Sequence, residues 1–140
     1  MNTTTALQIA ARVAELTGLC TTFQARFGRR YTVTPASPAD AHHLHRAICD
    51  KQAEIAVLLD SGVIECAMKK ASVWWRWQHT MDTATAGELA REANHLIACC
   101  AYFEASSCES GASPGLMAAQ AAIAGMLHPE VRQDISAALP

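Results

Sequence analysis

The sequence predicts an all-α fold, a single-domain irregular helical bundle of five to six helices spanning residues 1–140. Apolar residues recur at alternating intervals of three and four in nearly every segment outside residues 28–37, which is the spacing of one face of an α-helix. Short breaks containing Gly, Ser or Pro separate these segments. A chain of 140 residues also has the usual size of one domain.

The clearest helical pattern covers residues 85–107, and we expect the bundle to be organised around this helix. Thr85 and Glu88 have the spacing of a capping box, which predicts that the helix begins there. Its apolar face comprises Leu89, Ala93, Leu96, Cys100 and Phe103, followed by Ser107.

The first helix is predicted over residues 5–27, and Gly28 is expected to end it. Its apolar face comprises Ile9, Val13, Leu16, Cys20, Phe23 and Phe27. Gly18 lies inside this pattern, where glycine costs ~1 kcal/mol relative to alanine, so it is expected to mark a close helix approach or a bend. Residues 31–34 look extended, but one isolated strand does not make a sheet, so an ordered loop is predicted.

The second helix is predicted to begin at Ser37-Pro38, with Ser as N-cap and Pro at the first helical position, and to end at Ser61-Gly62. Its inner face comprises Ala41, Leu44, Ile48, Ile55, Leu58 and Leu59. A third helix is expected over residues 63–81. Because the link between them is so short, these two helices should be antiparallel neighbours.

Two helices are predicted after residue 107. Ser113 is the expected N-cap of a fifth helix, whose inner face comprises Leu116, Met117, Gln120, Ile123 and Leu127. After His128-Pro129, a short sixth helix contains Val131, Ile135 and Leu139.

The composition excludes several classes of protein. Apolar residues make up 51% of the chain, which argues against disorder, and the net charge of −2 does not indicate binding to nucleic acid or to an anionic membrane. The sequence contains no stretch of about 18 uninterrupted apolar residues, so no membrane span is predicted. The first residues do not resemble a signal peptide. We therefore expect a cytoplasmic protein whose six cysteines are reduced. Abundant Ala, and Arg in excess of Lys, suggest a bacterial genome or a mobile element.

The predicted third helix is apolar on two sides. The side that includes Trp75 is expected to pack inward. Aromatic and basic residues form a stripe over much of the remaining surface of the helix. We call this the predicted contact stripe, and it comprises Lys70, Val73, Trp74, Arg76 and Trp77. Either the helix is surrounded by neighbours of the same chain, or the stripe binds a partner or a second copy, since Trp and Arg are enriched in binding hot spots.

Histidines and cysteines flank the apolar faces of two predicted helices. On the second helix the flank comprises His42, His45 and Cys49, and on the fourth it comprises Glu88, Glu92, His95 and Cys99. These are ligands that zinc prefers, and Glu92 and His95 have the Glu-x-x-His spacing of di-iron bundles. A di-iron bundle needs that motif twice and the sequence contains it once, so no metal and no cofactor are expected.

A small basic cluster ends the first helix. It comprises Arg26, Arg29 and Arg30 beside Tyr31. Three arginines are few for binding phosphates, and Arg near a helix C-terminus also interacts favourably with the helix dipole. Nucleic-acid binding is therefore not expected.

No catalytic motif accompanies these features, so the sequence predicts a binding protein rather than an enzyme. The expected function is protein–protein contact, as an inhibitor or regulator of a larger bacterial assembly, with anti-CRISPR and other phage-encoded anti-defence proteins as examples of the class. The partner is a protein or a second copy of the chain. The alternative is a metal-binding helical bundle with oxidoreductase or hydrolase chemistry.

Overall fold

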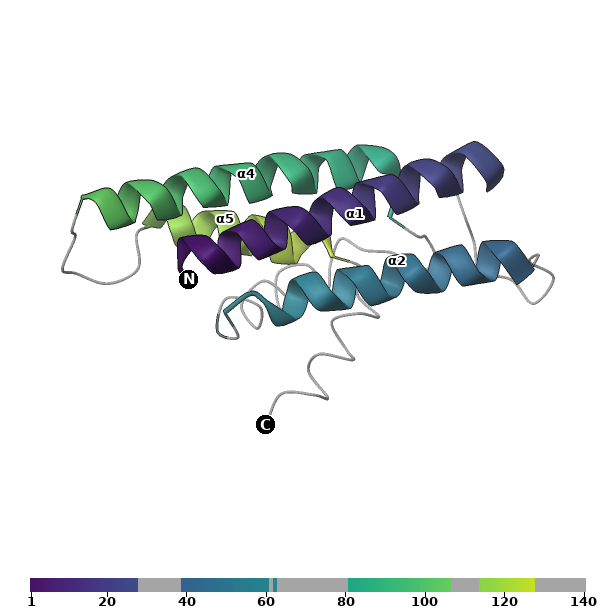
Figure 1. The fold of residues 1–140 in the computed structure, drawn as a ribbon, viewed down its shortest axis with the longest axis horizontal. Helices are drawn as coiled ribbons and strands as arrows, with labels where there is room; N and C mark the ends of the chain where they lie inside the picture. Colours follow the sequence, from purple (N-terminus) through teal and green to yellow (C-terminus); the bar gives the residue numbers. More distant parts are fainter. Residues whose placement is uncertain (28–38, 61, 63–80, 107–113, 128–140) are drawn as a thin grey trace.

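The described part of the structure, a computed structural model, is entirely helical (Figure 1). It covers residues 1–27, 39–60, 62, 81–106 and 114–127. The helices are α1 (Thr3–Phe27), α2 (Ala39–Val57), α4 (Thr83–Ala105) and α5 (Pro114–Met126). The predicted all-α class is confirmed. The predicted loop at 28–37 and the helices expected over 63–81 and 131–139 fall outside the described residues, except for residue 81.

Helix α1 lies between α4 and α2, and α5 lies behind them in the view of Figure 1. Helix α1 packs against both α4 and α2, whereas α4 packs against α1 and α5. Helix α4, around which the bundle was expected to be organised, thus shares the central position with α1. None of the described helices combines the length and the apolar character needed to cross a membrane.

The apolar stripes predicted for α1 and α4 form the centre of the core. In α1 the buried residues are Ala6, Ile9, Val13, Leu16, Cys20 and Phe23, and in α4 they are Ala86, Leu89, Ala93, Leu96 and Cys100. Each stripe follows one face of its helix, so burial confirms the helical spacing read from the sequence. Two antiparallel stripes of this length bury a continuous apolar seam, which is the dominant stabilising contribution in such a bundle.

Helix α5 faces the core in a slightly different orientation from the one predicted. Leu116, Gln120 and Ile123 are buried as expected, but Met117 is 48% exposed. Ala119 and Ala124 are buried instead. Met117 lies at one edge of the apolar face, and the small alanines let α4 cover the rest of the face more closely than a methionine would allow.

The beginnings of α1 and α4 are set by carboxamide and carboxylate caps. Asn2 Oδ1 accepts hydrogen bonds from the backbone N–H and the hydroxyl of Thr5, both at 2.9 Å. Asp82 Oδ1 accepts a hydrogen bond from Thr85 N at 2.8 Å. The predicted capping box at Thr85 and Glu88 was therefore wrong: Asp82 caps the helix, and Thr85 lies in its first turn, where it supplies an N–H that needs a partner.

Side-chain hydrogen bonds fix the antiparallel register of the two central helices. At one end, Thr3 N donates to Glu104 Oε1 at 3.3 Å. Further along, Thr17 Oγ1 lies 2.9 Å from Val13 O within α1 and 3.4 Å from Ala86 O in α4. These contacts join the beginning of α1 to the end of α4 and the later part of α1 to the beginning of α4.

A buried glutamine connects the end of α2 to α5. Leu58 N and Leu59 N donate to the carbonyls of Ile55 and Ala56 at 3.1 Å each, which tightens the turn after α2. After this turn, the backbone N–H of Asp60 donates a hydrogen bond to Gln120 Oε1, with a distance of 3.2 Å between the two atoms. Because Gln120 is buried, this hydrogen bond satisfies a polar atom that would otherwise be costly to bury.

Gly18 does not mark a close helix approach. It lies inside α1, and a Cβ atom added there would meet nothing within 4 Å. Gly18→Ala should therefore raise the free energy of unfolding by about 1 kcal/mol, because alanine loses less backbone entropy in a helix. Chemical denaturation measures this change. Ala14→Gly, at another exposed position of α1, should lower stability by a similar amount, and a destabilising Gly18→Ala would contradict the open environment.

Candidate functional site

Most residues of the predicted binding sites lie outside the described part of the chain. This holds for the whole predicted contact stripe, Lys70, Val73, Trp74, Arg76 and Trp77, which stays a prediction. Of the basic cluster, Arg26 is described and is exposed in the last turn of α1. Arg29, Arg30 and Tyr31 lie outside the described residues.

The histidine and cysteine flanks form pairs within single helices. His45 Nε2 lies 3.5 Å from Cys49 Sγ on α2, and His95 Nε2 lies 3.6 Å from Cys99 Sγ on α4. Helices α2 and α4 pack mainly on α1, so the two flanks do not converge on one centre. Within the described residues, no group of three or more His, Cys, Asp or Glu side chains could hold a metal ion together.

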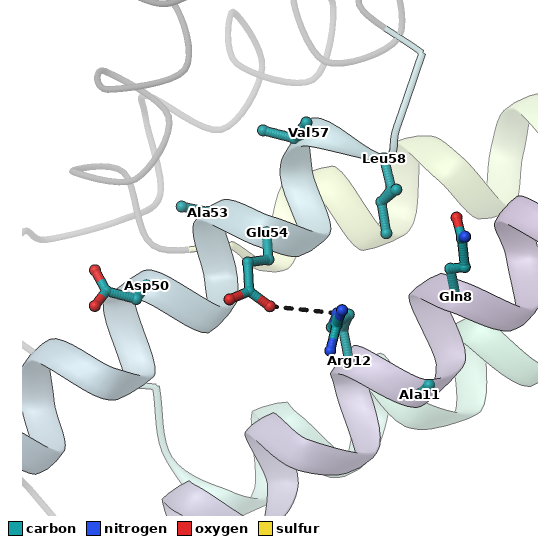
Figure 2. Close-up of a pocket in the computed structure, with 8 residues that line it drawn as sticks. All are labelled: Gln8, Ala11, Arg12, Asp50, Ala53, Glu54, Val57 and Leu58. Carbon is teal, nitrogen blue, oxygen red and sulfur yellow. Dashed lines mark ion pairs between the residues drawn. The ribbon is translucent and has the colours of Figure 1, made fainter.

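A groove that the sequence analysis did not predict lies between α1 and α2 (Figure 2). This α1–α2 groove is open and has a volume of about 790 Å³. It is lined by Gln8, Ala11 and Arg12 from α1 and by Asp50, Ala53, Glu54, Val57 and Leu58 from α2. Val57 is 70% exposed, more than the large apolar residues Leu7 and Met117. The lining therefore combines small apolar residues with charged groups.

Four charged side chains form a closed charge ring between α1 and α2: Arg12, Glu15, Lys51 and Glu54. Arg12 Nη1 lies 3.3 Å from Glu15 Oε2, and Arg12 Nε lies 3.3 Å from Glu54 Oε2 (Figure 2). Lys51 Nζ lies 2.7 Å from Glu15 Oε2 and 2.9 Å from Glu54 Oε2. Each cation thus contacts both carboxylates, and a network of this kind holds its side chains in place better than an isolated surface pair.

The charge ring shifts the titration of two of its members. Hydrogen bonds from Lys51 and then from Arg12 lower the pKa of Glu15 below its ordinary value of 4.5. Hydrogen bonds to Glu15 and then to Glu54 raise the pKa of Lys51 above its ordinary value of 10.5. Glu15 and Lys51 are therefore both charged at neutral pH, and the ring bridges one wall of the groove to the other.

The charge ring should stabilise the fold only within a pH window. A lowered carboxyl pKa gives stability that is present above 4.5 and is lost as pH falls through the folded-state pKa of Glu15. A raised Lys51 pKa gives stability that is present below 10.5 and is lost as pH rises through its folded-state value. Glu15→Gln should therefore lower the Tm at neutral pH and have little effect well below pH 4.5.

Thermal melts of the wild type and Glu15→Gln across this range test the prediction. In about 1 M salt, where the Debye length is about 3 Å, the neutral-pH difference should shrink. Glu88→Gln is the matched control, because Glu88 pairs with Arg91 at 3.9 Å on the exposed side of α4, and within the described residues it belongs to no network. An effect of Glu15→Gln that is independent of pH would show that the charge ring does not contribute through its charges.

Part of the charge ring was visible in the sequence. Arg12 and Glu15 are three residues apart on one predicted helix, and Lys51 and Glu54 are three apart on the next, which is the spacing of ion pairs along a helix. The sequence does not specify that these two pairs face one another. That depends on how α1 and α2 are rotated about their axes when they pack.

Comparison with known proteins identifies no relative. No protein-family description, curated protein or solved structure matches this chain.

Proposed function

We propose that this protein acts by protein–protein contact, as an inhibitor or regulator of a larger bacterial assembly, and not as an enzyme. The observation that carries this proposal is the α1–α2 groove with the exposed Val57 on its wall. The groove has two helical walls, and its apolar lining residues lie beside the Arg12–Glu54 ion pair that crosses it. Such a surface suits an amphipathic helix of a partner, which would place its apolar side against the apolar lining.

The lining of the groove specifies the chemistry of the partner segment. Ala11 and Ala53 are small, so the groove can receive large apolar side chains spaced three or four residues apart. Asp50 lies on the α2 wall and makes no ion pair within the described residues. The bound segment should therefore carry a Lys or Arg opposite Asp50, since a pairing of opposite charges fixes register and partner choice.

The class of protein that we propose is a cytoplasmic anti-defence protein of a phage or mobile element, anti-CRISPR proteins among them. The length of 140 residues and the Ala-rich, Arg-rich composition support this class. The predicted contact stripe on the expected third helix of a five- to six-helix bundle would supply a second binding surface, towards the same partner or a second copy.

A charged side chain placed in the groove tests the proposed binding surface. Ala11→Arg introduces a large cation on the groove wall, and Ala101→Arg makes the same change at an exposed position of α4. The partner is captured with the wild type, identified, purified and titrated with all three proteins. We expect Ala11→Arg to weaken binding about 30-fold or more, the equivalent of about 2 kcal/mol, and Ala101→Arg to bind as the wild type does.

Equal affinity of the wild type and Ala11→Arg would exclude the groove as the binding surface. Circular dichroism and Tm measurements on both Arg variants ensure that a loss of binding is not a loss of fold. Ala11 and Ala101 are both exposed, so neither substitution requires the core to repack.

Trp77→Ala tests the predicted contact stripe separately. If Trp77 contacts a partner or a second copy, its truncation should cost about 2 kcal/mol or more of binding and leave the Tm unchanged. If it lies in a core, truncation should instead cost about 3–5 kcal/mol of stability. Measuring Tm and association on one sample distinguishes the two. A large fall in Tm with unchanged association would remove the stripe from the proposed binding surface.

A further inference from the structure

The His95–Cys99 pair on α4 has the geometry of half a zinc site. A zinc ion bound by histidine at about 2.0–2.1 Å and by cysteine at about 2.3 Å, with a tetrahedral angle between them, holds the nitrogen and sulfur about 3.6 Å apart. The observed distance from His95 Nε2 to Cys99 Sγ is 3.6 Å. The two donor atoms therefore already have the spacing of two ligands of one zinc ion.

Both side chains are accessible on the outer surface of the bundle. His95 is exposed and Cys99 is partly exposed, on a helix whose opposite face is buried against α1. The neighbouring Cys100 is not available in the same way, because it is buried, with 1% of its surface exposed. Cys100 Sγ also lies 3.8 Å from Met1 O. Cys99 is thus the thiol on α4 that an incoming metal ion can reach.

Two ligands do not complete a zinc site, which needs four. Within the described residues no third His, Cys, Asp or Glu joins the pair. A second copy of the chain related by a two-fold axis would present the same pair, because a two-fold interface places one surface against itself. Two copies of His95 and Cys99 make the His₂Cys₂ set that is common in structural zinc sites.

One further pair of residues on this face of α4 is complementary across the two-fold axis. In an antiparallel pair of α4 helices centred between His95 and Cys99, Arg91 and Tyr102 lie at nearly equal distances on either side of the centre. Each Tyr102 would therefore meet the Arg91 of the other copy, and an Arg over a tyrosine ring is a favourable contact. Tyr102 is 76% exposed, which leaves its ring available for this contact. Ala98, between the two ligands, is small enough to let the helices approach.

We infer that His95 and Cys99 bind zinc, or a similar thiophilic divalent ion, between two copies of the chain, and that the metal joins them into a dimer. The site lies on α4, outside the α1–α2 groove, so a dimer formed in this way leaves the groove open. It differs from a metal centre within one chain, because one ion is held per two chains and metal binding is coupled to association.

Zinc titration of reduced, metal-free protein tests the inference, with molar mass measured by light scattering. We expect one zinc per two chains, a doubling of the mass, and reversal by a chelator. Co²⁺ in place of zinc should give the thiolate charge-transfer and visible bands of a tetrahedral site with cysteine ligands. His95→Ala and Cys99→Ser should abolish both zinc-dependent dimerisation and these bands, with unchanged circular dichroism.

Cys49→Ser is the matched control. It removes a thiol from the other helical pair, His45–Cys49 on α2, whose donor atoms are 3.5 Å apart, and the zinc-dependent dimer should persist. Tyr102→Ala should weaken the dimer while both ligands remain. The inference is overturned if zinc binds one per chain without a change of mass, if Cys99→Ser still dimerises with zinc, or if the dimer resists chelator and dissociates with reductant, which would indicate a Cys99 disulfide.

Discussion

Truncating Leu16 to alanine is expected to lower the free energy of unfolding by about 2–5 kcal/mol, because it leaves a cavity in a core that cannot fully collapse. Leu16 is 0% exposed and lies on α1, the helix that packs against both α2 and α4. A loss of this size should lower the Tm by on the order of 10 °C for a domain of this length. Chemical and thermal denaturation measure both quantities.

Leu7→Ala provides a control on the same helix with the same chemical change. Leu7 is 54% exposed, so its truncation removes little buried surface and should change stability by about 0.5 kcal/mol or less. The difference between the two variants isolates burial from helix propensity, since both replace leucine by alanine within α1. Similar losses for Leu7→Ala and Leu16→Ala would contradict the observed orientation of α1.

Cys20 is expected to be the least reactive of the described thiols by a wide margin. Burial, and secondly the charge of Asp82, raise its pKa from 9.0 to about 12. This change alone lowers the thiolate fraction at neutral pH by about 1,000-fold, and the thiolate is the species that reacts. The core must also open locally before a reagent can reach Cys20. Its alkylation should therefore be much slower than that of Cys99, which is partly exposed.

Alkylation under native conditions, with mass-spectrometric mapping of each cysteine over time, measures the two rates. Cys20, Cys49, Cys99 and Cys100 all carry thiols in the structure, so each gives a signal. Unfolding in denaturant should remove the difference between Cys20 and Cys99, because burial is its main cause. Comparable native rates for the two residues would show that Cys20 is not held in the core.

The α1–α2 groove and the charge ring are features that the sequence alone did not predict. Helix α1 was predicted with nearly correct bounds, whereas α2 was predicted to continue to Ser61-Gly62 and ends at Val57. Each helix carries its own i,i+3 ion pair. The contacts of Arg12 with Glu54 and of Lys51 with Glu15 join residues about 40 positions apart. Only the rotation of one helix against the other brings such residues together, and periodicity within a helix carries no information on it.

Within the described residues, the sequence by itself determined where the helices lie and, for α1 and α4, which face is buried. The reason is that a stripe of apolar residues at 3.6-residue spacing has to be removed from water whatever it packs against. The tertiary structure decided the rest. It placed α1 beside α4 at the centre, turned Met117 outward and Ala119 inward, and separated the His45–Cys49 and His95–Cys99 pairs by placing their helices on different sides of α1. These features depend on which stripes meet, and the apolar stripes of an alanine-rich chain are similar enough to pack in more than one order.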